Sequence, residues 1–117
     1  MVSLSVVRAG GHVVRFTVRG HAGAAEYGSD IVCAGVSALA IAAANGLAKH
    51  AGARVAVRSA RRGGTLECVI LECRSGDVRT RADAILETMI SGITAIAHEY
   101  PDHVRVNNDS RLIGPID

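Results

Sequence analysis

The sequence GHAGAAEYGSDIVCAGVSALA occupies residues 20–40, and the rest of the chain is best interpreted outward from it. It begins where an alternating strand pattern ends, passes through a segment rich in glycine and alanine, and continues as an almost unbroken apolar run. A run that is apolar nearly all round predicts a helix covered on most of its sides. The segment therefore predicts a strand, a loop and a buried helix in succession.

Two residues of this segment, His21 and Cys33, are candidates for catalysis. If Asp30 or Ser29 caps the helix, Cys33 lies in its first turn, where unpaired N–H groups and the helix dipole stabilise a thiolate. His21 lies twelve positions upstream, across the loop, and is placed to transfer protons. The simpler interpretation makes Cys33 a small buried hydrophobe and His21 an ordinary polar residue at a strand end. Residue types alone leave both interpretations open.

Asp30 and Ser37 are candidate supporting residues. Asp30 either orients His21, as the third member of a triad does, or caps the helix. Ser37 follows Cys33 by four residues, on the same helical face. It either hydrogen-bonds near the site or bonds back to the carbonyl of Cys33.

The loop over residues 22–29 contains Gly23 and Gly28 on either side of Tyr27. Its small residues favour a flexible flap above the candidate site, because it joins the two candidate catalytic residues. A plain surface connection has the same composition, and Tyr27 either shields the site or closes the edge of the domain.

The motifs Gly20-His21-Ala22 and Asp30-Ile31-Val32-Cys33, with the AGVSALA that follows, resemble the signature of the Prp family of ribosomal-processing cysteine proteases. The similarity extends more loosely over most of the chain, including the EYPDHVRV segment at residues 99–106. The resemblance implies an α+β fold, a homodimer, and catalysis by His21 and Cys33. It also implies that the substrate is the amino-terminal extension of a large-subunit ribosomal protein, cleaved after bulky hydrophobic or aromatic residues.

In the mechanism expected from this resemblance, the Cys33 thiolate attacks a peptide carbonyl and forms an acyl-enzyme. His21 keeps the thiol ionised and then protonates the leaving amine. Amide N–H groups at the helix start, including that of Cys33, are the expected oxyanion donors. Two other functions remain: a non-enzymatic dimeric ribosome-assembly factor with the same fold, and a thiol redox sensor. The sensor would need a resolving cysteine near Cys33, whereas the other two cysteines lie on a remote predicted hairpin.

The composition narrows the classes of protein. With 117 residues the chain suits one domain, expected over residues 1–106 with a mobile tail over 107–117. A formal net charge of +2 and the absence of a basic run argue against a nucleic-acid partner. No signal peptide is apparent, and the apolar run at residues 31–44 is too short to span a bilayer, so we expect a cytoplasmic protein without a membrane partner.

The cysteines and histidines do not suggest a metal site or a cofactor. Three cysteines without C-x-x-C spacing fit a reducing compartment better than a disulfide framework. No histidine pairs with another four residues away in the zincin pattern; the five are His12, His21, His50, His98 and His103. We therefore expect no metal and no cofactor.

The remaining patterns complete an α+β fold of the order ββαββα, with a final short strand at residues 104–106. Strands are expected at residues 2–8 and 13–19 around Gly10-Gly11, with Val14, Phe16 and Val18 on the buried face. A second hairpin is expected over residues 54–73, with Cys68 and Cys73 as structural residues. Helices are expected over residues 31–51, ending at Gly52, and 80–100, ending before Pro101.

Overall fold

The first hairpin consists of strands β1 (Val2–Ala9) and β2 (His12–Arg19), which pair antiparallel. Gly10 and Gly11 join them with φ angles of 61° and 84°, which glycine adopts without steric cost. In this computed structural model of the chain, the residues that can be described are 1–20, 27–60 and 64–109.

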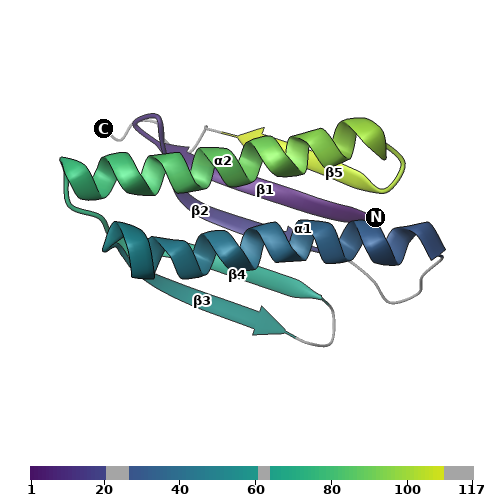
Figure 1. Cartoon of the computed structure of the whole chain (residues 1–117), viewed down its shortest axis with the longest axis horizontal. Helices are drawn as coiled ribbons and strands as arrows, with labels where there is room; N and C mark the ends of the chain where they lie inside the picture. Colours follow the sequence, from purple (N-terminus) through teal and green to yellow (C-terminus); the bar gives the residue numbers. More distant parts are fainter. Residues whose placement is uncertain (21–26, 61–63, 110–117) are drawn as a thin grey trace.

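The second hairpin is formed by β3 (Arg54–Ala60) and β4 (Thr65–Glu72), again as predicted. Strand β4 pairs antiparallel with β2, and this pairing joins the two hairpins into one sheet. The order of strands across the described sheet is β3-β4-β2-β1-β5 (Figure 1). Its hairpin pairings are all antiparallel, so the largely antiparallel α+β sheet expected from the sequence is confirmed.

The last strand, β5 (Val104–Asp109), lies at the edge of the sheet and pairs parallel with β1. It is longer than the predicted strand at residues 104–106, and its residues 107–109 had been assigned to the tail. Asn107 and Asn108 pair with Ser5 and Val6, so backbone hydrogen bonds extend the strand although its last side chains are polar. Residues 110–117 of the predicted tail lie outside the described part of the chain.

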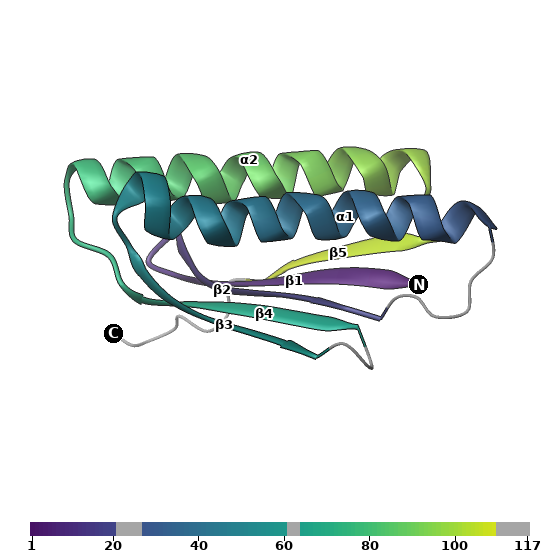
Figure 2. The same ribbon diagram turned by 60° about the horizontal axis from the view of Figure 1, so that its bottom comes forward.

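Both long helices, α1 (Tyr27–Gly46) and α2 (Asp77–Glu99), cover the same face of the sheet and run side by side (Figures 1 and 2). Helix α2 ends before Pro101, as predicted, and begins three residues earlier than expected. Its buried residues lie on one face at helical spacing: Ala82, Leu86, Met89, Ile90 and Ile93. The opposite face of the sheet carries no helix (Figure 2).

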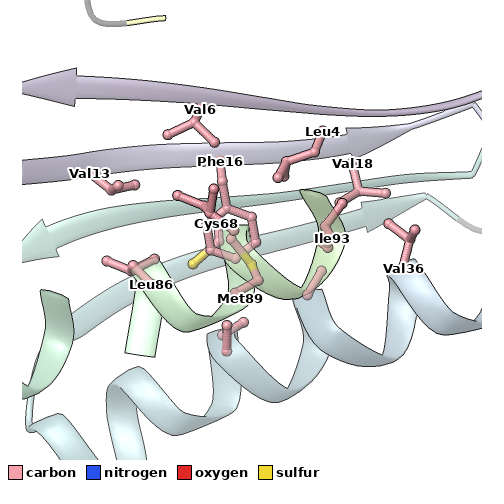
Figure 3. Packing of buried hydrophobic residues seen from close by; sticks show 14 of the residues in the cluster. Leu4, Val6, Val13, Phe16, Val18, Val36, Cys68, Leu86, Met89 and Ile93 are labelled. Carbon is pink, nitrogen blue, oxygen red and sulfur yellow. The ribbon is translucent and has the colours of Figure 1, made fainter. Parts of the chain in front are cut away.

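The core lies between the sheet and the two helices. Phe16, the single phenylalanine of the chain, is fully buried and pairs with Cys68 across the β2–β4 ladder. Aliphatic side chains from both layers surround it, among them Leu4, Leu86 and Ile93 (Figure 3). The core therefore consists mainly of Val, Leu, Ile and Ala side chains packed around the aromatic ring of Phe16.

One strand prediction is wrong in register. Val14 was expected on the buried face, but Val13 is the buried residue and Val14 is only partly buried. The register between β1 and β2 shifts at Val7/Arg8, where Val7 pairs with Arg15 and Arg8 with Val13. Val14 has no partner on β1 at this bulge. The alternation of buried and exposed residues that holds at Phe16 and Val18 therefore does not extend back to Val14.

Helix α1 continues through one π-helical segment, Leu47–Ala51, and ends at Gly52, the predicted stop. Gly52 has a φ of 82°, and its N–H donates to the carbonyl of Leu47. Contrary to the sequence expectation, the helical segment Ile31–Ala51 is long and apolar enough to cross a membrane by length and composition alone. Here its inner face packs in the core of the sandwich, where Val36, Ala40 and Leu47 have no exposed surface.

Candidate active site

Cys33 is the seventh residue of α1, because the helix begins at Tyr27 rather than after Asp30. The predicted cap at Ser29 or Asp30 is therefore wrong: both residues lie inside the helix, in its first turn. A polar residue just before an apolar run is the usual cap signal, but here the helix extends one turn beyond the apolar run. An acidic residue in a first turn is stabilised by the helix dipole without acting as a cap.

This shift places Cys33 in the second turn of α1, where the predicted activation by the helix start is weaker. The dipole effect decays within the first turn. In a regular helix starting at Tyr27, the N–H of residue 33 donates to the carbonyl of residue 29. A backbone N–H of Cys33 that is committed to the helix in this way argues against its predicted role as an oxyanion donor, which stays a prediction.

The predicted flap is shorter than the sequence indicated. Tyr27 and Gly28, expected in the loop, belong to the first turn of α1. His21 and Gly23 lie outside the described residues, as do the side chains of Tyr27 and Asp30. The roles predicted for these residues remain predictions.

Gly20, the first residue of the G-H-A motif, ends the strand β2 in a conformation that requires glycine. Its φ is 79°, and a Cβ at this position would lie 2.6 Å from the carbonyl oxygen of Met1. A contact of that length is shorter than real Cβ atoms tolerate, and the left-handed backbone adds strain for any other residue. The glycine at position 20 therefore allows the chain to pass close to Met1, the residue before β1, where it leaves β2.

Cys33 is 9% exposed and belongs to the same core cluster as Val36, the next inward-facing residue of α1. Ser37, one turn after Cys33, is partly buried and lines a groove together with Val18 of β2. Val18 precedes Gly20 by two residues. The packing thus brings the helical turn that follows Cys33 against the end of the strand that leads into the G-H-A motif.

The other two cysteines differ from Cys33 in position. Cys68 is fully buried on β4, and burial raises the pKa of its thiol to about 11. A thiol with such a pKa is protonated and unreactive at neutral pH. Cys73 follows the end of β4 and is partly exposed. Within the described residues, no three His, Cys, Asp or Glu side chains lie together in a way that could hold a metal ion.

The sequence did not identify the groove itself, which lies between α1 and the β3–β4 hairpin and has a volume of about 410 Å³. Its walls include Ile41 of α1 and Val57 of β3, which are 49% and 48% exposed. We call it the α1–β3 groove. The sequence signal for this groove was Ile41, a large apolar residue one helical turn after the polar Ser37.

The comparisons with known proteins agree with this architecture. A model of the family described as cysteine protease Prp matches residues 1–105. A ribosomal processing cysteine protease Prp from Bacillus subtilis is 32% identical over 97 residues, which cover 83% of this chain and 87% of the relative.

Two solved structures of the essential ribosomal processing protease Prp from Staphylococcus aureus share the fold. The complex with a substrate peptide superposes with a TM-score of 0.82 at 27% identity, covering 93% of this chain and 100% of that chain. A second, with a covalently linked product peptide, gives a TM-score of 0.78 at 28% identity with the same coverage. The resemblance seen in the sequence is confirmed: this chain belongs to the cysteine protease Prp family and is a cysteine protease.

Proposed function

We propose that this chain is an endopeptidase that removes the amino-terminal extension of a large-subunit ribosomal protein, with Cys33 as nucleophile and His21 as general acid and base. The observation that carries the proposal is the meeting of Val18 and Ser37 in one groove. Val18 lies two residues before the G-H-A motif, and Ser37 one turn after Cys33. The end of β2, which leads into the first motif, and the start of α1, which carries Cys33, lie at the same end of the sheet (Figure 1).

In the proposed reaction, the sulfur of Cys33 attacks the carbonyl carbon of the scissile peptide bond and a thioester forms. The amino-terminal extension is the acyl part, and the mature ribosomal protein leaves as the amine. His21 holds the thiol in its ionised form and donates the proton that the leaving amine needs. Water then hydrolyses the thioester, releasing the extension and restoring Cys33.

His21 carries most of the thiol activation in this proposal. Cys33 is nearly buried and lies in the second turn of α1, so desolvation opposes the thiolate while the dipole gives little help. An imidazolium beside the sulfur offsets that desolvation, because an opposite charge at short range favours the ionised thiol. Asp30 remains the proposed orienting partner of His21, since its position in α1 removes the alternative role as the helix cap.

The substrate proposal rests on the relatives, which are named ribosomal processing proteases. We place the activity in the cytoplasm, where ribosomal proteins are made, and propose a homodimer. The half-exposed Leu71 near the end of β4 supports dimerisation, because 49% of its apolar side chain is left in contact with water. Light scattering coupled to size-exclusion chromatography distinguishes a monomer from a dimer of the 12.1 kDa chain.

The test of the substrate is a mass-spectrometric cleavage assay. Wild-type protein and Cys33→Ala are each incubated with the host's ribosomal protein carrying its extension, and with the same protein lacking it. We expect a discrete amino-terminal peptide to be released from the extended protein by the wild type alone. If the folded, reduced enzyme leaves the extended protein intact, the proposal is wrong and a non-enzymatic assembly role replaces it.

A further inference from the structure

The face of the sheet that carries no helix can be assigned residue by residue from strand β2 (Figure 2). Phe16 and Val18 are buried in the core between the sheet and the helices. Neighbouring residues of a strand point to opposite faces, so Arg15, Thr17 and Arg19 lie on the other side of the sheet. We call this helix-free side the open face.

Strand pairing places two more arginines on the open face, because directly paired residues of neighbouring strands share a face. Arg105 on β5 lies level with Arg19, since both pair with the same residue of β1. Arg58 on β3 pairs with Glu67 of β4, and the partner of Glu67 on β2 is Thr17. The open face therefore presents four exposed arginines: Arg15, Arg19, Arg58 and Arg105.

The protein itself neutralises little of this positive charge. Arg15 lies 4.0 Å from a carboxylate oxygen of Glu67, at the limit of an ion pair. Arg19, Arg58 and Arg105 make no side-chain hydrogen bond or ion pair within the described residues. Three guanidinium groups of the open face are therefore available to a ligand.

Helix α2, on the other side of the sheet, has the opposite balance of charge. Its four carboxylates outnumber its two arginines, and these residues are Asp77, Asp83, Glu87 and Glu99 against Arg79 and Arg81. The formal net charge of +2 averages over this separation, which is why the total alone argued against a nucleic-acid partner. The local field, rather than the total charge, determines where a polyanion approaches a protein.

A hollow of about 590 Å³ lies on the open face, and both Arg19 and Arg58 line it. Glu67 contributes the single carboxylate of its lining, and Thr17 and Thr65 contribute hydroxyls. Thr17 is 7% exposed, and its hydroxyl has no hydrogen-bond partner within the described residues. A buried hydroxyl without a partner costs free energy, so the hollow favours a ligand that accepts a hydrogen bond there.

The chemistry of the open face fits a phosphate backbone. Guanidinium and hydroxyl groups donate hydrogen bonds to phosphate oxygens, and the guanidinium group does so in pairs. The described residues of this face include no aromatic side chain on which an unpaired base could stack, which favours a duplex over a single strand. Arg19 and Arg105 are two strands apart, or about 10 Å. A duplex carries one charge per about 1.7 Å of its axis, so several phosphates come within reach of this face.

A second copy of the chain does not suit the open face. Around a two-fold axis the same patch meets itself, so the arginines of one protomer would face those of its partner. Like charges brought together in this way oppose association. The dimer proposed above therefore leaves this face to another partner.

Resting on the proposed function for the choice of RNA among polyanions, we propose that the open face binds double-stranded RNA through its backbone phosphates. One phosphate lies in the hollow, where it accepts hydrogen bonds from Arg19, Arg58 and Thr17, and Arg105 contacts another. The 2′-hydroxyls of RNA add partners for the hydroxyl side chains of this face. Ribosomal proteins assemble on RNA, so this contact holds the enzyme near its substrate while Cys33, on the helix side of the sheet, stays accessible to it.

The test measures RNA binding in the Cys33→Ala background, by the anisotropy of a fluorescein-labelled RNA hairpin, between about 50 and about 200 mM salt. Arg19→Gln and Arg58→Gln should each weaken binding about tenfold at low salt. Each should also reduce the slope of log affinity against log salt by about 1, because one phosphate contact is lost. Lys49→Gln is the matched control, because it removes the same charge from the helical layer, and it should leave the slope unchanged.

Two further variants separate a ligand contact from a purely structural role. Glu67→Gln should strengthen RNA binding, because it removes the single carboxylate of the hollow. Thr17→Val should weaken RNA binding and at the same time raise the unfolding free energy in urea, because the unpartnered buried hydroxyl is gone. A structural role for the Thr17 hydroxyl would instead lower the unfolding free energy. Far-ultraviolet circular dichroism of each variant should match the parent.

Equal salt slopes for the parent, Arg19→Gln, Arg58→Gln and Lys49→Gln would overturn the proposal. Displacement of the hairpin by polyglutamate as effectively as by unlabelled RNA would also overturn it, and would point to an acidic protein as the partner. Binding is measured without cleavage, so failure of the protease proposal leaves this test intact. Binding of RNA by the open face of a chain whose wild type is inactive would support this proposal and refute only the protease function.

Discussion

Gly20 lies against the carbonyl oxygen of Met1 so closely that a Cβ on residue 20 would be 2.6 Å from it. We predict that Gly20→Ala loses at least about 1 kcal/mol of unfolding free energy, because a left-handed alanine is strained and the contact must open. The value of kcat/KM should fall by more than the loss of folded protein explains, because the chain leaves the sheet at Gly20, just before His21. Urea unfolding and kcat/KM for peptide cleavage measure the two effects.

Gly11→Ala provides the control for this prediction. Gly11 has a similar φ of 84°, but a Cβ there meets nothing within 4 Å. It should show the strain cost alone and keep full activity. Equal activity losses in the two variants would mean that the Met1 contact has no part in positioning the motif.

We predict that His21→Ala slows alkylation of Cys33 by iodoacetamide about tenfold at pH 7, because the thiol pKa returns toward or above its ordinary value of about 8.5. The rate in the variant should approach that of the wild type only as the pH rises past that value. Site-specific alkylation is followed by mass spectrometry, with His50→Ala at the far end of the helical segment as the control. An unchanged rate at pH 7 would show that His21 does not activate the sulfur.

Cys68 should resist the same reagent. Its burial raises the pKa of the thiol to about 11 and removes the sulfur from solvent. At pH 8 we expect alkylation of partly exposed Cys73 but none of Cys68 until urea unfolds the chain. Rapid modification of Cys68 in the folded protein would contradict the packing of Phe16 against it.

Arg8 and Glu87 connect the first hairpin to α2 through a 2.6 Å ion pair. The hydrogen bond from Arg8 lowers the pKa of Glu87, so this pair stabilises the fold above the ordinary carboxyl pKa and loses its contribution as the pH falls through the lowered value. Glu87 is 49% exposed, so Glu87→Gln should cost no more than about 1 kcal/mol at pH 7.

The cost of Glu87→Gln should shrink as the pH falls below the ordinary carboxyl range and through the lowered pKa of Glu87, as measured by urea unfolding at each pH. Glu72→Gln is the control, because Glu72 and its partner Arg54 are both more than 60% exposed at 3.4 Å. A cost for Glu87→Gln that did not change with pH would rule out a charge interaction as its source.

Much of the fold was predictable because its signals are local. Turns and helix ends are marked by Gly10-Gly11, Gly52 and Pro101. These signals depend only on the backbone preferences of glycine and proline and of the residues next to them. The errors occur where distant parts of the chain set the outcome. The bulge that excludes Val14 depends on pairing with β1, and the strand at residues 107–109 depends on a parallel partner.

The site shows the same division. The motifs containing His21 and Cys33 were evident from sequence, but the start of α1 at Tyr27 was not, because the cap signal at Ser29 and Asp30 competes with an earlier helix start. The α1–β3 groove also could not be predicted. It requires Ile41 and Val57, sixteen residues apart on different elements, to face each other across a gap that α1 does not cover.

The central claim is that Cys33 is the nucleophile, and trapping the acyl-enzyme tests it most directly. An aryl ester of the extension peptide makes acylation fast, so the thioester accumulates and is seen by intact mass spectrometry after acid quenching. We predict an adduct of the peptide mass minus one water, located on residue 33 and absent from Cys33→Ala. Turnover of the ester at full rate by Cys33→Ala, with no adduct on the wild type, would contradict the account.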